Sequence, residues 1–110
     1  MILLTTATPA IILAAGASTR LGRPKSLVEW NGETLIERAI RQLEAAGVEK
    51  IVIVTRSELA VDLLALASGS QIAINSNPEA GRNSSIQVGL LSLMKESGII
   101  PQRVLIVPVD

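Results

Sequence analysis

Short apolar runs alternate with longer stretches of helical spacing along this chain, and no other feature restricts its fold as strongly. Residues 10–15 read AIILAA, and residues 51–54, 71–74 and 104–107 are the other runs that we expect to form buried strands. Strands separated by helices favour a parallel sheet with right-handed crossovers. The sequence therefore predicts an α/β fold: a three-layer α/β/α Rossmann-like open sheet, mostly parallel.

The first helix is predicted from its end signals. Thr34 and Glu37 have the spacing of a capping box, apolar residues follow at helical intervals, and Gly47 supplies a C-terminal stop. Glu37 and Arg41 would then form an exposed pair four residues apart on this helix.

Two further helices follow the second and third strands. Ser57 is the predicted cap of one, in which Leu59 and Leu63 share a face. Ser84 and Gln87 have the spacing of a capping box for the other.

Before the first helix, residues 26–30 form a short extended stretch, and Asn31-Gly32 is a turn signal. Trp30 and the leucine stripes are expected in the core.

Composition excludes several classes of function. The net charge is zero and Trp30 is the only aromatic residue, which argues against a nucleic-acid surface. Cysteine and histidine are absent, which removes disulfides, the usual zinc sites and triads that use imidazole. Charged residues are only 18% of the chain and hydrophobic ones 48%, as expected for a buried parallel sheet or a piece of a larger domain.

The first nineteen residues carry no charged side chain, so a signal peptide or membrane span must be considered. Three threonines, Pro9 and Gly16 interrupt the apolar residues, and no basic residue precedes them. We therefore expect a cytoplasmic chain that does not engage a membrane, with residues 1–9 as a short leader.

The segment from residue 15 to residue 25 reads AGASTRLGRPK and cannot pack as core. Gly16 and its small neighbours allow the backbone to approach an anionic ligand, and Arg20 and Lys25 can supply positive charge. These properties suit a polyphosphate. The spacings of a P-loop and of G-x-G-x-x-G are absent. An ordinary loop with solvated cations is the alternative.

Three stretches carry a resemblance to a known family. LAAGASTRLGRPK at residues 13–25 resembles the L-A-A-G-x-S-x-R-x-G-x-P-K signature of the MobA-like nucleotidyltransferases, most closely in the form found in molybdenum cofactor cytidylyltransferases. SLVEWNGETLIERA and NSNPEAGRNSSIQVGL are similar to later motifs of the family and follow in the same order. The chain reaches VLIVPVD, where the family has a strand that ends in a metal-binding aspartate.

The resemblance implies transfer of a nucleoside monophosphate from an NTP, with CTP favoured, to a phosphate-bearing acceptor such as molybdopterin, with release of pyrophosphate. Arg20 and Lys25 would be the catalytic cations that neutralise the triphosphate, a role that needs no histidine or cysteine. The backbone that would bind the nucleotide belongs to Leu13, Ala14, Ala15, Gly16, Ala17 and Ser18.

Three more positions match the family. Gly81 and Ser85 would lie near the nucleobase, although the serine could instead serve only to cap its helix. Asp110 would be a ligand of Mg²⁺, which prefers carboxylate oxygens, although a solvated carboxylate at the chain end is the alternative.

Family members continue past the first metal-binding aspartate, so we interpret residues 1–110 as the N-terminal, nucleotide-binding part of one domain. Such a piece would lack acceptor contacts and turn over poorly, and its uncovered apolar surface would favour self-association. Two other functions stay open: nucleotidyl transfer to a sugar or alcohol phosphate, and a non-catalytic nucleotide-binding module.

Overall fold

A computed structural model describes residues 8–16, 27–67, 69–98 and 100–109 of the chain. Its main sheet has four strands in the order β5-β4-β1-β6, and every neighbouring pair is parallel. The strands are β1 (Ala10–Ala14), β4 (Ile51–Thr55), β5 (Gln71–Ile74) and β6 (Leu105–Pro108). The predicted parallel sheet is therefore confirmed.

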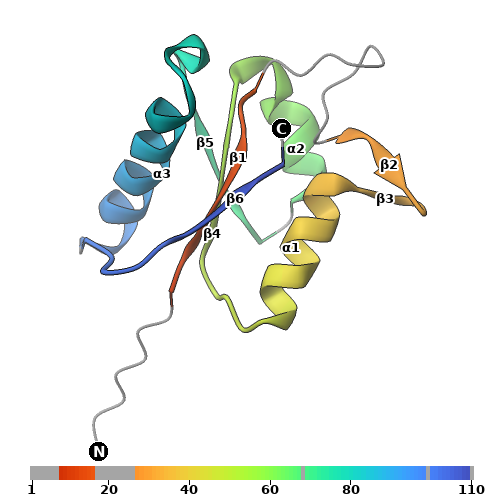
Figure 1. Ribbon diagram of the computed structural model, residues 1–110, viewed down its shortest axis with the longest axis horizontal. Coiled ribbons are helices and arrows are strands. Elements are labelled where there is room, and N and C mark those ends of the chain that lie inside the picture. The colour runs from red at the N-terminus through yellow and green to blue at the C-terminus, as the bar shows by residue number, and fades with distance from the viewer. Residues whose placement is uncertain (1–7, 17–26, 68, 99, 110) are drawn as a thin grey trace, which may run out of the picture.

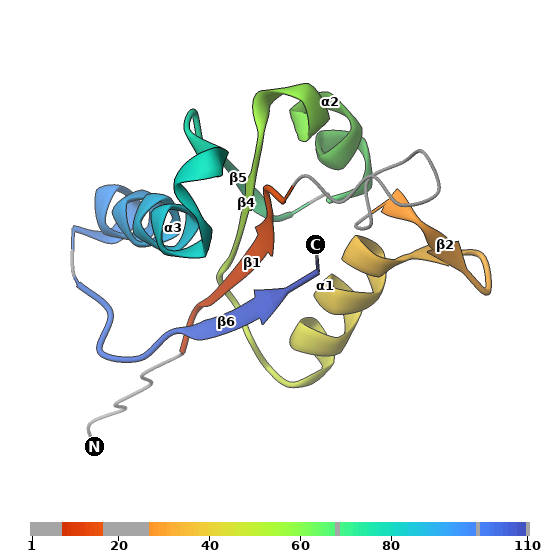
Figure 2. The ribbon, with the colours of Figure 1, turned by 45° about the horizontal axis from the view of Figure 1, so that its top comes forward.

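Helices cover both faces of the sheet, as Figures 1 and 2 show. Helices α1 (Leu35–Ala45) and α2 (Ser57–Leu66) lie on one face, and α3 (Arg82–Ser97) lies on the other. This arrangement is the predicted three-layer α/β/α fold.

Side chains of β1 alternate between the two faces, because successive residues of a strand point in opposite directions. Ile12 and Ala14 pack with α1 and α2, whereas Ile11 and Leu13 pack with Leu93 of α3. Helix α3 comes close to the sheet at Gly89, where a Cβ atom would lie 2.7 Å from Cγ2 of Ile11. All five residues of β1 are buried, so β1 is the centre of the core.

A hairpin precedes α1 and consists of β2 (Glu29–Trp30) and β3 (Glu33–Thr34). Asn31 and Gly32 connect the strands with φ angles of 56° and 80°. Positive φ at both loop positions is the type I′ geometry that Asn-Gly favours, so the predicted turn is confirmed. Trp30 was expected in the core, but its side chain lies on this projecting hairpin and is 67% exposed.

The capping box of α1 is present. Thr34 Oγ1 accepts a hydrogen bond from the Glu37 backbone N–H at 3.2 Å, and Glu37 Oε1 accepts one from the Thr34 N–H at 3.0 Å. The expected pair between Glu37 and Arg41 does not form, because Glu37 is engaged in the cap. Arg41 instead makes a two-pronged contact with Glu33 of the hairpin, with nitrogen–oxygen distances of 2.9 and 3.0 Å.

The other two helices begin differently from the prediction. Ser57 is the first residue of α2 rather than its cap, and its hydroxyl donates to Glu58 at 2.8 Å. Helix α3 begins at Arg82, two residues before the predicted Ser84 cap. Gly81 precedes it with a φ of 101°, and the serine hydroxyls lie inside the first turn. Those serines bond to Gly81 and to a distant asparagine, so neither caps the helix.

Strand β6 is displaced by one residue from the predicted run at 104–107 and includes Pro108. The N–H groups of Leu105 and Val109 donate to Pro9 and Leu13, the residue before β1 and one within it. By the alternation of a strand, the nitrogen of Pro108 faces the outer side of β6, where no bond to β1 is lost. Proline is therefore compatible with this edge position.

Candidate functional site

The carboxyl ends of all four parallel strands lie at one edge of the sheet, which we call the carboxyl edge. Residues 14–16, 55–58, 75–85 and 108–109 leave the sheet there. Open parallel sheets bind ligands at this edge, because the loops that leave the strands converge on it. Thr55, Arg56 and Asn75 belong to these segments.

The end of β1 is held by two side chains: Thr55, the last residue of β4, and Arg56, the residue that follows it. The backbone pairing of these strands ends at Ala14 and Thr55. Beyond it, Thr55 Oγ1 donates to the carbonyl oxygen of Ala14 at 3.1 Å, and Arg56 Nε donates to that of Ala15 at 3.0 Å. These side-chain bonds continue the attachment of β1 to β4 past the end of the ladder.

Arg56 also has carboxylate partners on two other segments. Its Nη1 lies 3.5 Å from Glu58 Oε2 in the first turn of α2. Its Nη2 lies 3.8 Å from Glu79 Oε1 in the short 3₁₀ helix η3 (Pro78–Ala80). A hydrogen bond from the Ser57 hydroxyl, helped by a backbone N–H and by Arg56, lowers the pKa of Glu58 from its ordinary value. The carboxylate form that pairs with Arg56 is thereby favoured.

Asn75 links the end of β5 to α3. Its side chain is 3% exposed, and Nδ2 donates to the hydroxyls of Ser84 at 2.9 Å and Ser85 at 3.0 Å. Its Oδ1 accepts the N–H of Asn77, and its own N–H donates to the carbonyl oxygen of Thr55. A buried polar side chain is costly unless it is hydrogen-bonded, and Asn75 uses both ends of its amide.

The structure places part of the predicted nucleotide site at this edge. Leu13, Ala14 and Ala15 are each 3% exposed or less. Their carbonyl oxygens accept hydrogen bonds from Val109, Thr55 and Arg56, respectively. Gly16 is half-buried at the start of the following turn. Ala17, Ser18, Arg20, Lys25 and Asp110 lie outside the described residues, and their roles stay predictions.

Ser85 is joined to the same edge by its bond from Asn75, and the carbonyl oxygen of Gly81 accepts a bond from the Ser84 hydroxyl, which Asn75 also contacts. Gly81 is exposed, and its φ of 101° suits a residue without a side chain. Ser85 is only 5% exposed, and its hydroxyl already accepts a bond from Asn75. A contact between this hydroxyl and a base would need the hydroxyl proton, which Asn75 does not use.

Sequence reasoning missed Thr55, Arg56 and Asn75 as site residues. Thr55 and Asn75 follow directly after the predicted strands at residues 51–54 and 71–74, and Arg56 is the next residue after Thr55. A polar residue just past the end of a strand was the available signal.

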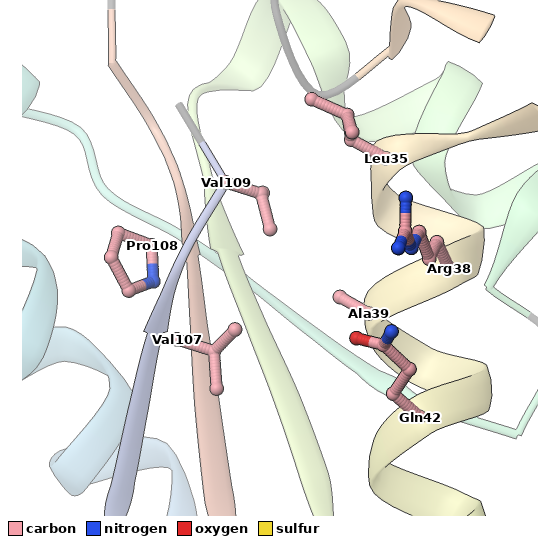
Figure 3. A pocket seen from close by; sticks show the side chains of 7 residues that line it. All are labelled: Leu35, Arg38, Ala39, Gln42, Val107, Pro108 and Val109. Carbon is pink, nitrogen blue, oxygen red and sulfur yellow. The ribbon is translucent and has the colours of Figure 1, made fainter. Parts of the chain in front are cut away.

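A cavity of about 300 Å³ lies between α1 and the end of β6, on the face of the sheet that α1 covers. Figure 3 shows Val107 and Val109 pointing toward α1. The lining residues are Leu35, Arg38, Ala39, Gln42, Val107, Pro108 and Val109. Mostly apolar walls with two polar side chains from α1 are suited to a ligand with both apolar and polar parts.

No group of three or more acidic or other metal-ligating side chains that could hold an ion occurs among residues 8–16, 27–67, 69–98 and 100–109. The proposed ligand Asp110 follows Val109, whose N–H donates to the carbonyl oxygen of Leu13 at 3.0 Å. Within the part of the chain that the structure describes, no helix is both long and apolar enough to cross a membrane.

The fold is that of a three-layer α/β protein whose parallel strands all end at the carboxyl edge. Residues 10–110 match the MobA-like NTP transferase domain, and the chain belongs to that family. The family match confirms the resemblance drawn from the motifs.

Curated relatives share parts of the chain. A probable molybdenum cofactor guanylyltransferase of Opitutus terrae is 36% identical over 76 residues, which are 69% of this chain and 38% of the relative. A bifunctional IPC transferase and DIPP synthase of Thermococcus kodakarensis is 38% identical over 84 residues, which are 72% of this chain and 19% of that protein. The chain therefore spans well under half the length of these relatives.

A solved structure has the same fold. The crystal structure of Rv0371c from Mycobacterium tuberculosis H37Rv superposes with a TM-score of 0.69 at 23% identity. The match covers 94% of this chain and 52% of that one. It supports the fold of the described residues as the fold of part of a larger domain.

Proposed function

We propose that the full-length protein transfers a nucleoside monophosphate from an NTP to a phosphate-bearing acceptor and releases pyrophosphate. One observation carries the proposal: the family's phosphate-binding motif begins at the end of β1, where Thr55 and Arg56 hold the backbone of Ala14 and Ala15. Phosphoryl transfer depends mainly on positioning and on stabilising charge, and a fixed backbone serves both.

The charged groups of the motif would supply the chemistry. Arg20 can grip two phosphate oxygens with its planar guanidinium, and Lys25 can approach the α-phosphate as a point charge. Both would stabilise the charge that spreads over the phosphoryl oxygens during transfer. Asp110 would bind Mg²⁺, which would supply further neutralisation of the triphosphate.

The base and the acceptor are finer parts of the proposal. The compact Gly-Arg-Pro-Lys ending of the motif favours CTP and a molybdopterin acceptor by its resemblance to cytidylyltransferases. GTP is the second candidate, because the Opitutus terrae relative is named a guanylyltransferase. A sugar or alcohol phosphate is the alternative acceptor. We also propose that the protein is cytoplasmic.

Pyrophosphate release from the full-length protein tests the activity. CTP, GTP, ATP and UTP are each supplied with Mg²⁺ and with molybdopterin, sugar-phosphate or alcohol-phosphate acceptors. We expect one NTP and one acceptor class to stand out, with turnover lost when Mg²⁺ is chelated. If no combination of NTP and acceptor releases pyrophosphate above background, the proposal is refuted.

Substitution of the two cations separates an enzyme from a binding module. Lys25→Ala and Arg20→Ala should each lower kcat/KM about 100-fold or more, in the range of single groups that stabilise transition-state charge. Exposed Lys95 of α3 gives a matched control, and Lys95→Ala should leave the rate unchanged. If the wild type binds NTP without any turnover, a nucleotide-binding module without chemistry replaces the proposal.

A further inference from the structure

Arg56 has more partners than a charged residue at the end of a strand needs. Its side chain is only 17% exposed, and three segments of the chain contact its guanidinium. Two of the contacts are to carboxylates that are themselves 66% and 74% exposed. The third, to the carbonyl oxygen of Ala15, is the shortest at 3.0 Å and points to the backbone that leaves β1. Arginine is rarely buried this far unless its charge and donors are used.

The Ala15 contact fixes more than one atom. A trans peptide group is planar, so its carbonyl and the following N–H point in opposite directions and rotate together. The structure has no cis peptide among the described residues. Arg56 therefore sets the plane of the Ala15–Gly16 peptide, which comes just before the part of the motif that carries Arg20 and Lys25.

The two carboxylates keep the guanidinium in place from the other side. Glu58 belongs to α2 and Glu79 to η3, so Arg56 joins the backbone of Ala15 to the first turn of α2 and to η3. Long, exposed ion pairs add little stability by themselves. Their geometric effect is to restrict the orientation of a donor whose strongest bond is to Ala15.

We propose that Arg56 is a positioning residue, which holds the Ala15–Gly16 peptide in the orientation that binds the NTP phosphates. This inference rests on the proposed function and adds a residue outside the family motif. Arg56 acts through the backbone, so its loss should weaken NTP binding more than it slows the chemical step.

The test uses the full-length protein with the NTP that pyrophosphate release selects. Arg56→Gln should raise the KM for that NTP about 10-fold or more, with a smaller fall in kcat and no change in the KM for the acceptor. Amide hydrogen exchange of Gly16 in the free protein should become faster, because the bond that Arg56 makes to its peptide is lost. Arg56→Lys should recover part of both effects, since one ammonium can still donate to Ala15 but lacks the fork that reaches two carboxylates.

Two further variants separate positioning from general loss of structure. Arg41→Gln removes an exposed arginine and its ion pair at the hairpin, and should leave the NTP KM and Gly16 exchange unchanged. The double variant Glu58→Gln with Glu79→Gln leaves the Ala15 bond in place and should raise the NTP KM only a few-fold. It also keeps the inference testable if Arg56→Gln does not fold.

Three results would overturn the inference. An unchanged NTP KM in Arg56→Gln removes the role. A raised KM with unchanged Gly16 exchange means that Arg56 contacts the nucleotide itself. A double variant as impaired as Arg56→Gln means that the carboxylates, not the Ala15 bond, carry the effect. A wild-type protein that neither binds nor converts any NTP instead refutes the proposed function, which is a separate outcome.

Discussion

The strands on either side of β1 end in different surroundings. On one side, β4 is buried along all five residues, and its end is joined to β1 and β5 by bonds from Thr55, Arg56 and Asn75. On the other side, β6 keeps Leu105 44% exposed and Ile106 38% exposed. Its end borders the apolar cavity beside α1 rather than a cluster of polar side chains.

The ends of β4 and β6 therefore differ in what surrounds them: hydrogen-bonding side chains at β4 and mostly apolar side chains at β6. Hydrogen bonds from side chains to backbone set the direction of individual peptide groups, which is what recognition of phosphates by N–H groups requires. Apolar walls set only the volume and polarity of a space. The β1–β4–β5 part of the edge is where we propose that the NTP phosphates bind, whereas the β6 part borders a mostly apolar space.

The largest expected difference comes from the same residue type on the two flanking strands. Ile53 of β4 is fully buried against α1 and α2, so Ile53→Ala should lower the free energy of unfolding by about 2–5 kcal/mol. Ile106→Ala on β6 removes a side chain that is 38% exposed and should cost less than about 1 kcal/mol. Denaturant unfolding of the full-length variants measures both.

Equal losses would break the contrast between the strands. A large effect of Ile106→Ala would mean that another part of the protein, or a second copy, covers β6. The predicted self-association then becomes testable, because coverage by a second copy would make the loss depend on protein concentration.

A smaller effect is expected at the polar part of the edge. Asn75→Ala removes the donors to Ser84 and Ser85 and the acceptor of the Asn77 N–H, and should cost about 1–3 kcal/mol. Asn83→Ala, at an exposed position of α3, is the matched control and should stay within about 0.5 kcal/mol of the wild type. If the two variants unfold alike, water replaces the Asn75 bonds and the edge is less rigid than its contacts indicate.

Most of the fold could be predicted because its signals are local. Asn31-Gly32 determined a turn, Thr34 with Glu37 determined a helix start, and the β-branched run at residues 51–54 determined a strand. In each of these cases the residues that carry the signal are neighbours in the chain. Trp30 was misplaced because its burial depends on whether the hairpin packs on the sheet, which no local pattern encodes.

The site was less predictable because its bonds join distant residues. Arg56 is 41 positions from Ala15, and Asn75 is 10 positions from Ser85, so only the assembled sheet brings them together. The serines at 84 and 85 were misread for the same reason: their spacing fits a cap, but α3 starts at Arg82 and tertiary contacts occupy their hydroxyls. The motif located the turn after β1, whereas the residues that hold it came from the structure.

The smallest effect belongs to Glu33 and Arg41, an ion pair at the hairpin, away from the carboxyl edge. The hydrogen bond from Arg41 lowers the pKa of Glu33 from its ordinary value of 4.5. The stabilisation is therefore present above that ordinary value and is lost as the pH falls through the lowered one. Arg41 is 61% exposed, so solvent screens the pair and Glu33→Gln should scarcely move the denaturant midpoint at pH 7.

Measured again well below the lowered pKa, the wild type and Glu33→Gln should have the same midpoint, because the protonated Glu33 carboxyl is then neutral, as the Gln amide is at every pH. A difference that grows as the pH falls would contradict the assignment, since it would require a Glu33 that stabilises the protein when protonated. A large difference at pH 7 would mean that the hairpin contact rivals the bonds of the carboxyl edge. The Glu33–Arg41 pair could then no longer be treated as less important for stability than the contacts of the carboxyl edge.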